Sequence, residues 1–143
     1  MGRPEPMDPA SFVRLFIRKE RRERLAFELT QPERLPAGLD RFCHRAEELL
    51  EAKRILMQGE DLERRGAFAR FLAQRNERCR LLSRDLLPDA PLLPAEDAVR
   101  QALLCFDAVL ILGSSFAIVF GEVMKGGRGK YLLAAPPREK PYP

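Results

Sequence analysis

The stretch of this chain that most constrains its fold is residues 106–134, which contain two apolar runs at 108–112 and 116–123. Both runs are rich in valine, isoleucine and phenylalanine, a composition that favours β-strands. The Gly-Ser-Ser triplet at 113–115 between them has the composition of a hairpin turn. A glycine-rich segment then leads into a third candidate strand at 130–134. We therefore predict a meander of three antiparallel strands.

The run at 116–123 has apolar side chains on both of its faces. Successive side chains of a strand point to opposite faces, so Phe116, Ile118 and Phe120 share one face. The alternate positions hold alanine, valine and glycine. Two apolar faces are typical of a central strand that is covered on both sides. Helices of this chain or a partner subunit must therefore supply the cover.

Size and composition fit a single folded domain. The chain has 143 residues, of which 45% are hydrophobic and 32% are charged, close to the averages of globular proteins. We expect a flexible leader at residues 1–10, one domain at 11–135 and a flexible proline-rich tail at 136–143. The leader holds three prolines and no apolar stretch, so it does not resemble a signal peptide.

The cysteines and the apolar runs indicate a cytoplasmic protein. Cys43, Cys79 and Cys105 lie far apart and form no C-x-x-C motif. An odd number of scattered cysteines fits a reducing compartment, and we expect no disulfides. The longest apolar run is broken at Gly113 and falls short of the roughly 20 residues that a membrane-spanning helix needs. We therefore expect no membrane span.

The N-terminal part of the chain has helical patterns. Asp8 followed by Pro9 is typical of a helix start, with the aspartate as the N-cap. An apolar stripe follows, stops within the wholly charged segment 18–24 and resumes at Leu25. Either one helix crosses solvent between two packed ends, or it breaks near Arg18 and restarts.

The middle of the chain alternates helical patterns with short apolar segments. Residues 37–50 have the apolar spacing of one helical face, and we predict further helices at 60–78 and 94–105. Residues 53–58 and 79–83 fit either a strand or a helical end, and for 53–58 we favour a strand. These elements define an α+β fold, with a helical N-terminal half packed on a small, mainly antiparallel C-terminal sheet. The sheet would be mixed if both short segments joined it.

The first charged segment is the most basic part of the chain. Residues 14–24 contain six basic and two acidic residues, a net charge of +4 that equals the formal charge of the whole chain. In one continuous helix, four of the arginines would share a face. Such a face suits binding to phosphates. The four are Arg14, Arg18, Arg21 and Arg22.

The same segment also fits an ordinary solvated surface. Glu20 is placed to pair with Arg24, and Lys19 is placed to pair with Glu23, each four residues apart. No recognition-helix scaffold and no stacking aromatic accompany these charges. We therefore favour the solvated surface and keep binding to nucleic acid as the alternative.

A glycine-rich basic loop precedes the last candidate strand. Its backbone N–H groups could approach an anion while its cations add charge. The segment lacks the spacing of a phosphate-binding P-loop and does not open a helix, so we favour a hairpin turn. The candidate anion-binding residues are Lys125, Gly126, Gly127, Arg128 and Lys130.

Two further polar residues are candidates for a partly buried site. Glu122 continues the face of Phe116, so we expect it to be partly desolvated and paired with Arg128 or Lys130. His44, the single histidine, follows Asp40 by one helical turn, which would allow a hydrogen bond between them. One histidine and scattered cysteines do not favour a metal site. We expect no metal and no cofactor.

The motifs of known enzyme classes are missing from the sequence. It contains no nucleophile elbow, dinucleotide-binding fingerprint, EF-hand or zinc-protease motif. We therefore favour a non-enzymatic binding or protein-interaction module, with self-association through the doubly apolar sheet as one form of it. The alternative is a nucleic-acid-binding protein that uses segments 14–24 and 125–130. An enzyme that uses Glu122 or His44 is a third hypothesis, and it would require a deep pocket around either residue.

Overall fold

The chain begins with a series of helices, and the strands of a sheet follow, with further helices between some of them. A computed structural model describes most of the chain. The described residues are 5–62, 66–75, 77–84, 90–123 and 128–135.

Four helices precede the first strand. The predicted start at Asp8 is confirmed, because its side chain accepts a hydrogen bond of 2.7 Å from the backbone N–H of Ser11. The helices are α1 (Pro9–Phe16), α2 (Arg22–Thr30), α3 (Leu35–His44) and α4 (Ala46–Leu49), and a 3-10 turn, η1 (Lys19–Arg21), precedes α2.

The chain breaks between α1 and α2, as one of the two alternatives predicted. Ile17 is extended and forms an isolated antiparallel bridge with Leu50. The N–H of Arg18 donates to the carbonyl of Leu49 at 2.9 Å, and the N–H of Glu51 donates to the carbonyl of Phe16 at 2.8 Å. These hydrogen bonds to residues 49–51 take the place of those that residues 16–18 would make in a continuous helix.

The single helix predicted at 37–50 is wrong in detail. The structure has α3 and α4 in its place, with α3 beginning at Leu35 and the interruption at Arg45. The N–H of Arg45 bonds to the carbonyls of both Arg41 and Phe42, which tightens the last turn of α3 and ends it.

All six strands form one antiparallel sheet. The central meander is confirmed, with Ile111 opposite Ile118 and Ile118 opposite Leu132. The expectation of a mixed sheet is wrong, because β1 and β2 both join the sheet and each runs opposite to its neighbours. The order is β1-β6-β5-β4-β2-β3. The strands are β1 (Ile55–Gln58), β2 (Arg78–Ser83), β3 (Leu92–Pro94), β4 (Val109–Leu112), β5 (Phe116–Phe120) and β6 (Lys130–Ala134).

Among the described residues, two helices and one 3-10 turn lie between these strands, and another 3-10 turn leads into β1. The helix predicted at 60–78 is shorter than expected, because the chain enters β2 soon after α5 ends. The helix predicted at 94–105 is present as α6, with Pro94 at its N-cap position. The elements are η2 (Ala52–Arg54), η3 (Gly59–Leu62), α5 (Ala67–Arg75) and α6 (Ala95–Leu103).

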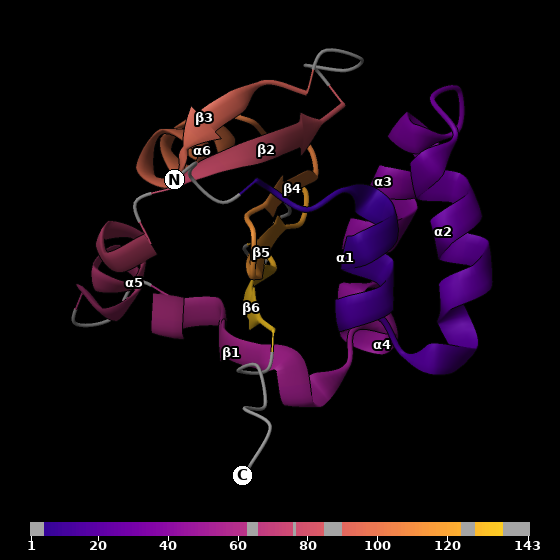
Figure 1. Cartoon of the computed structure of the whole chain (residues 1–143), viewed down its shortest axis with the longest axis horizontal. Coiled ribbons are helices and arrows are strands. Elements are labelled where there is room, and N and C mark those ends of the chain that lie inside the picture. The colour runs from indigo at the N-terminus through magenta and orange to yellow at the C-terminus, as the bar shows by residue number, and fades with distance from the viewer. Residues whose placement is uncertain (1–4, 63–65, 76, 85–89, 124–127, 136–143) are drawn as a thin grey trace, which may run out of the picture.

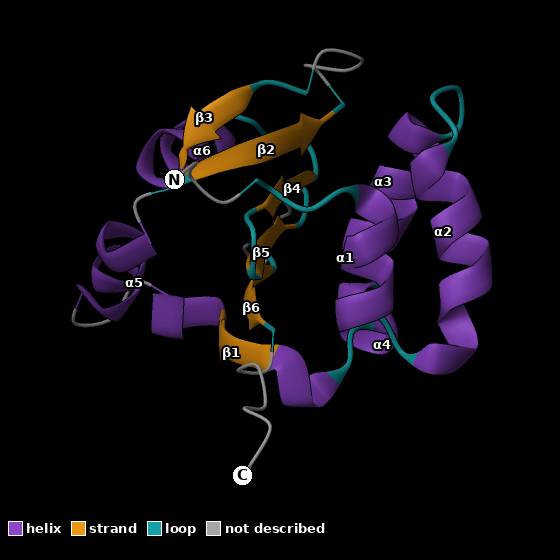
Figure 2. Cartoon of the chain, in the orientation of Figure 1, coloured by secondary structure: helices purple, strands orange, loops and turns teal. Residues whose placement is uncertain are grey.

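The elements stack in three layers (Figure 1). Helices α1 to α4 pack on one face of the sheet, and α5 and α6 pack on the other. Figure 2 shows the central strands β4, β5 and β6 between α5 on one side and α1 to α4 on the other. The α+β class and the N-terminal helical layer are confirmed.

Each face of the sheet has its own apolar core. On the side of α1 to α4, the ring of Phe12 packs edge-on against Phe42, with centroids 5.5 Å apart. On the other side, Phe71 packs edge-on against Phe116 at 5.3 Å. Strand β5 is buried along its whole length, as expected for a central strand. The chain itself therefore covers both faces of β5.

Packing begins before residue 11. Met7, which the sequence analysis assigned to the leader, is buried in the core on the side of α1. Its N–H donates to the carbonyl of Gly113 at 2.8 Å, which ties the segment before α1 to the β4–β5 turn.

Candidate functional site

The four arginines that the sequence placed on one helix face do not share one. The continuous helix that such a face requires does not form, because α1 ends at Phe16 and Ile17 is extended before η1 and α2 begin. The break therefore distributes these residues over α1, the connecting segment and the start of α2. They are Arg14, Arg18, Arg21 and Arg22.

Two of these arginines donate hydrogen bonds to backbone carbonyls near the break between α1 and α2. The Nε of Arg18 donates to the carbonyl of Leu50 at 3.0 Å, and the Nε of Arg22 donates to the carbonyl of Ile17 at 2.8 Å. Arg14 makes a hydrogen bond within α1. Arg18 and Arg22 thus satisfy the carbonyls of the residues that cap the C-terminal ends of α4 and α1.

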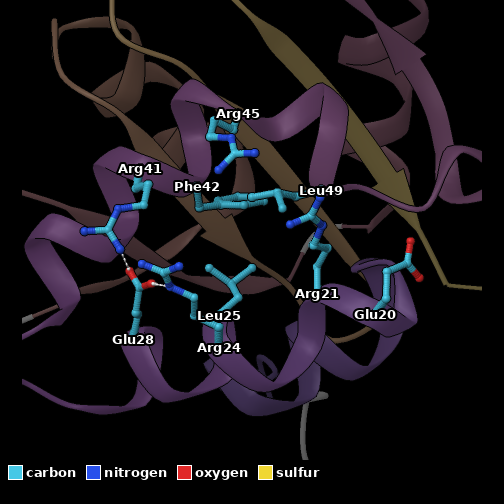
Figure 3. A pocket seen from close by; sticks show the side chains of 9 residues that line it. All are labelled: Glu20, Arg21, Arg24, Leu25, Glu28, Arg41, Phe42, Arg45 and Leu49. Carbon is cyan, nitrogen blue, oxygen red and sulfur yellow. Dashed lines mark hydrogen bonds and ion pairs between the residues drawn. The ribbon is translucent and has the colours of Figure 1, made fainter.

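The fourth arginine lines a pocket between α2 and the α3–α4 pair. The pocket has a volume of about 230 Å³. In Figure 3, Arg21 and Arg45 approach it from opposite sides, Arg21 from η1 just before α2 and Arg45 from the end of α3. The basic residues around it, which we call the arginine pocket, are Arg21, Arg24, Arg41 and Arg45.

Apolar side chains form part of the lining of the arginine pocket. Leu25, Phe42 and Leu49 are buried in the core between the helices and also reach the pocket. Guanidinium groups beside an apolar surface suit a ligand that carries an anionic group next to an apolar one.

A buried carboxylate organises the pocket. One oxygen of Glu28 accepts a hydrogen bond of 3.2 Å from Nε of Arg24, and the other accepts one of 2.6 Å from Nη1 of Arg41. The solvated-surface interpretation predicted that Arg24 pairs with Glu20. In the structure Arg24 pairs with Glu28 instead. The shared carboxylate links α2 to α3 and holds two guanidinium groups in place (Figure 3).

The pocket remains electropositive after these pairs are counted. Its lining has four arginines but only two carboxylates, those of Glu20 and Glu28. Arg45 pairs with Glu48 at 2.7 Å, and this hydrogen bond, helped by nearby arginines including Arg21, lowers the pKa of Glu48. Within the described part of the chain, the guanidinium of Arg21 makes no hydrogen bond, so it is the donor of the pocket that is open to a ligand.

The groove continues along α2 and α3 beyond the Glu28 ion pairs. A second pocket of about 420 Å³ shares Arg24, Glu28 and Arg41 with the first. It adds the exposed ring of Phe27, over which the guanidinium of Arg34 lies 5.0 Å from the ring centroid.

The structure brings the two polar candidates, His44 and Glu122, to one open pocket of about 380 Å³. Both side chains are exposed. The expected burial of Glu122 is wrong because β5 ends at Phe120. Asp40 accepts a hydrogen bond of 2.7 Å from Arg84 in place of His44. This exposed setting does not supply the deep pocket that the enzyme hypothesis requires.

The structure describes part of the glycine-rich loop. Lys125, Gly126 and Gly127 lie outside the described residues. Lys130 is half-buried and begins β6 opposite Phe120.

Arg128 has a structural role. Its guanidinium donates to the carbonyls of Gly121, of Ala102 at 3.1 Å and of Asp107 at 2.8 Å. It also lies over the ring of Phe120, 5.1 Å from the centroid, and burial lowers its pKa. Arg128 therefore holds backbone groups together. The expected ion pair between Arg128 and Glu122 is not among its contacts in the described residues.

Arg128 and the basic segment 14–24 do not lie on one surface. Arg128 contacts α6, which lies on one side of the sheet, whereas segment 14–24 belongs to α1 and α2 on the other side (Figure 1).

Sequence reasoning missed the residues that build the arginine pocket. The burial of Glu28 could have been predicted from the sequence. Glu28 follows Leu25 by three residues and is therefore a carboxylate on the apolar stripe of α2. Arg41 lies on α3 and Arg45 follows its last residue, but nothing in the sequence shows that these two arginines meet α2.

A second buried carboxylate was also missed, and its role is structural. Glu77 accepts a hydrogen bond of 2.8 Å from the N–H of Ser114 and further bonds from the Ser114 hydroxyl. It thereby fixes the turn between β4 and β5.

The thiols of Cys43 and Cys79 are buried. Burial raises the pKa of Cys79 to about 12 and also raises the pKa of Cys43. Both sulfurs therefore remain protonated at neutral pH. Among the described residues, no group of three or more histidines, cysteines and carboxylates is placed to hold a metal ion.

No family model, curated protein or solved structure matches the chain. In the part of the chain that the structure describes, no helix has the length and apolar character needed to cross a bilayer.

Proposed function

We propose that this protein is a non-enzymatic binding module that takes an acidic segment of a partner protein in the arginine pocket. The observation that carries the proposal is the placement of Arg21 and Arg45 on opposite sides of a pocket that is partly lined with apolar side chains. The exposed setting of His44 and Glu122 gives no comparable support to catalysis.

The size of the pocket favours a side chain over a free small molecule. Sites for small molecules usually enclose about 300–1,000 Å³ and bury most of the ligand. The arginine pocket, at about 230 Å³, lies below this range. It could hold an acidic side chain and one apolar neighbour, while the remainder of the partner covers the surrounding helices.

The ion pairs inside the pocket favour binding without rearrangement. Glu28 already holds Arg24 and Arg41 in fixed positions, so these guanidinium groups lose little conformational freedom when a ligand arrives. Arg21 and Arg45 can then donate to a carboxylate in the charge-assisted geometry that arginine favours.

Single-stranded nucleic acid is the second candidate, because Arg34 and the exposed ring of Phe27 extend the groove as a stacking surface. Glu20 and Glu33 line the same groove and would repel successive phosphates. For this reason we place the acidic protein segment first.

Fluorescence anisotropy with the full chain tests the proposal. The probes are labelled peptides in which leucine or phenylalanine stands beside glutamates, matched peptides with lysine in place of glutamate, and labelled single-stranded DNA and RNA. We expect the acidic peptides to bind and the lysine peptides not to bind. Binding should weaken with salt because the contacts are partly exposed.

Two variants locate the site. Arg21→Glu should lower the affinity for the acidic peptides at least about tenfold, since a carboxylate replaces the open donor. Arg14→Glu is the matched control, because Arg14 is exposed in the same basic segment but does not line the pocket. Equal losses in both variants, or no binding of acidic peptides at low salt, would overturn the proposal. Binding of oligonucleotides alone would replace it with the second candidate.

A further inference from the structure

One of the two opposed arginines of the arginine pocket is already held by a carboxylate. The Nε and Nη2 of Arg45 both donate to the same oxygen of Glu48, at 3.1 and 2.7 Å. An acidic side chain that enters the pocket therefore has to share Arg45 with Glu48 or displace Glu48 from it. When both groups are carboxylates, the exchange at Arg45 is like for like, and the ligand gains mainly from Arg21.

The surroundings of Glu48 hold more positive charge than one carboxylate neutralises. The hydrogen bond from Arg45, its charge and the charges of Arg21 and Arg18 lower the pKa of Glu48. Arg18 is fixed nearby by its hydrogen bond to the carbonyl of Leu50. Three guanidinium groups therefore act on a single negative charge, which leaves an excess of two positive charges at this end of the pocket.

The pocket lining has an excess of the same size. It contains four arginines and two glutamates, a net charge of +2. Glu28 is engaged with Arg24 and Arg41, so the excess belongs to the end of the pocket that Arg21 and Arg45 approach. A phosphate ester carries a charge of about −1.5 to −2 at neutral pH and has three acceptor oxygens, so one such group matches this excess.

The size of the pocket and its neighbouring charges favour one isolated phosphate. A volume of about 230 Å³ is small for a nucleotide. Glu33 lines the adjoining part of the groove and would repel a second phosphate, but it does not line the arginine pocket itself. Leu25 and Leu49 can meanwhile cover an apolar residue next to the phosphorylated one.

We infer that the arginine pocket recognises a phosphorylated side chain of the partner segment, with the phosphate held between Arg21 and Arg45. The inference rests on the function proposed above and adds that phosphorylation of the partner controls binding. A phosphate dianion has more charge than a carboxylate and a further acceptor oxygen, so it can draw Arg45 away from Glu48 while it also binds Arg21.

Fluorescence anisotropy with the full chain tests the inference. Three labelled peptides carry leucine beside one variable position, which is phosphoserine, glutamate or serine. We expect the phosphoserine peptide to bind at least about tenfold more tightly than the glutamate peptide, and the serine peptide to bind most weakly. Equal affinities for phosphoserine and glutamate would overturn the inference and leave the proposed function standing. If none of the peptides binds at low salt, both are overturned.

Acidification separates the two anions. A phosphate ester has its second pKa at about 6, so the phosphoserine peptide loses charge between about pH 7.5 and 5.5. The glutamate peptide keeps its charge, because the ordinary pKa of glutamate is about 4.3, and it reports any change in the protein over the same range. We expect the advantage of phosphoserine to shrink as the pH falls. An advantage that stays constant over this range contradicts recognition of the dianion.

Two variants locate the phosphate. Arg21→Gln should weaken the binding of both anionic peptides, whereas Arg45→Gln should weaken the phosphoserine peptide more and so reduce its advantage several-fold. Arg14→Gln is the matched control, because Arg14 is exposed but does not line the pocket, and it should leave the advantage unchanged. An advantage that survives Arg45→Gln in full overturns the inference. Tighter binding of a 5′-phosphorylated oligonucleotide than of the phosphoserine peptide would also overturn it.

Discussion

Gly38 of α3 packs directly against Glu28 of α2, and a Cβ atom at position 38 would lie 2.8 Å from the Cβ of Glu28. The two helices approach closely at this point only because residue 38 has no side chain. The close approach brings the Glu28 carboxylate within reach of Arg24 and Arg41. The geometry of the arginine pocket therefore depends on a glycine that does not line it.

Gly38→Ala should destabilise the protein by about 1–3 kcal/mol, because the added methyl group overpacks the contact between α2 and α3. Helix propensity alone predicts the opposite sign, since alanine is favoured over glycine in a helix by about 0.5–1 kcal/mol. Urea unfolding measures the change. Ala37→Gly at the exposed neighbouring position is the control and should show the propensity effect alone. A more stable Gly38→Ala variant would show that the helices can separate at no cost.

Glu28→Gln should change stability and binding in opposite directions. The loss of the shared carboxylate should cost about 1 kcal/mol of stability, a small value because both arginine partners are substantially exposed. The pocket gains positive charge, so the acidic peptides should bind more tightly and with a steeper dependence on salt.

Chemical unfolding and anisotropy measure the two effects of Glu28→Gln on one preparation. Glu23→Gln, an exposed change on the same helix that does not touch the pocket, should alter neither quantity appreciably. Weaker binding by Glu28→Gln would show that fixed positions of Arg24 and Arg41 matter more than net charge.

Arg128→Lys should be destabilising although it keeps the charge. A lysine ammonium cannot reach three carbonyls in the fixed geometry of the guanidinium, and it loses the stacking on Phe120. We expect a loss of about 1–3 kcal/mol. Hydrogen exchange should show faster exchange at the N–H groups of Cys105 and Val123, which the clamped segments hold. Stability equal to wild type would mean that a single cation contact suffices.

Asp8→Ala should reveal a pH-dependent contribution of the first helix cap. The hydrogen bonds from the backbone and side chain of Ser11 hold the pKa of Asp8 below its ordinary value of 3.8. The stabilisation is therefore complete above this value and is lost as the pH falls through the lower pKa of the folded state. Asp8→Ala should cost about 1 kcal/mol at neutral pH, and its difference from wild type should shrink in acid.

Thermal unfolding as a function of pH measures this cap. Asp8→Asn is the control, because asparagine caps a helix nearly as well and does not titrate. An Asp8→Ala effect that persists unchanged in strong acid would show that the carboxylate charge is not the source of the stabilisation.

Local patterns in the sequence were enough to predict the centre of the sheet. The alternation in β5 and the turn at 113–115 specify both the strand and its pairing within about twenty residues, so no distant contact is needed. The N-cap at Asp8 was predictable for the same reason, since its partner Ser11 is three residues away. The class of fold followed from the order of these local elements.

The candidate sites depended on contacts between residues far apart in the chain. The bridge from Ile17 to Leu50 breaks the first helix and separates the arginines that the sequence had grouped. The pairing of Glu28 with Arg41 joins two helices across a contact that only Gly38 permits.

The sequence by itself thus determined the strands of the central meander, the apolar stripes of the helices and the α+β class, because these depend on the periodicity of neighbouring side chains. Only the tertiary structure decided which arginines face a pocket, which support the backbone, and that the apolar residues after α6 remain exposed. The reason is physical: a charge or an apolar side chain acquires its role from the groups packed against it, and those groups come from other parts of the chain.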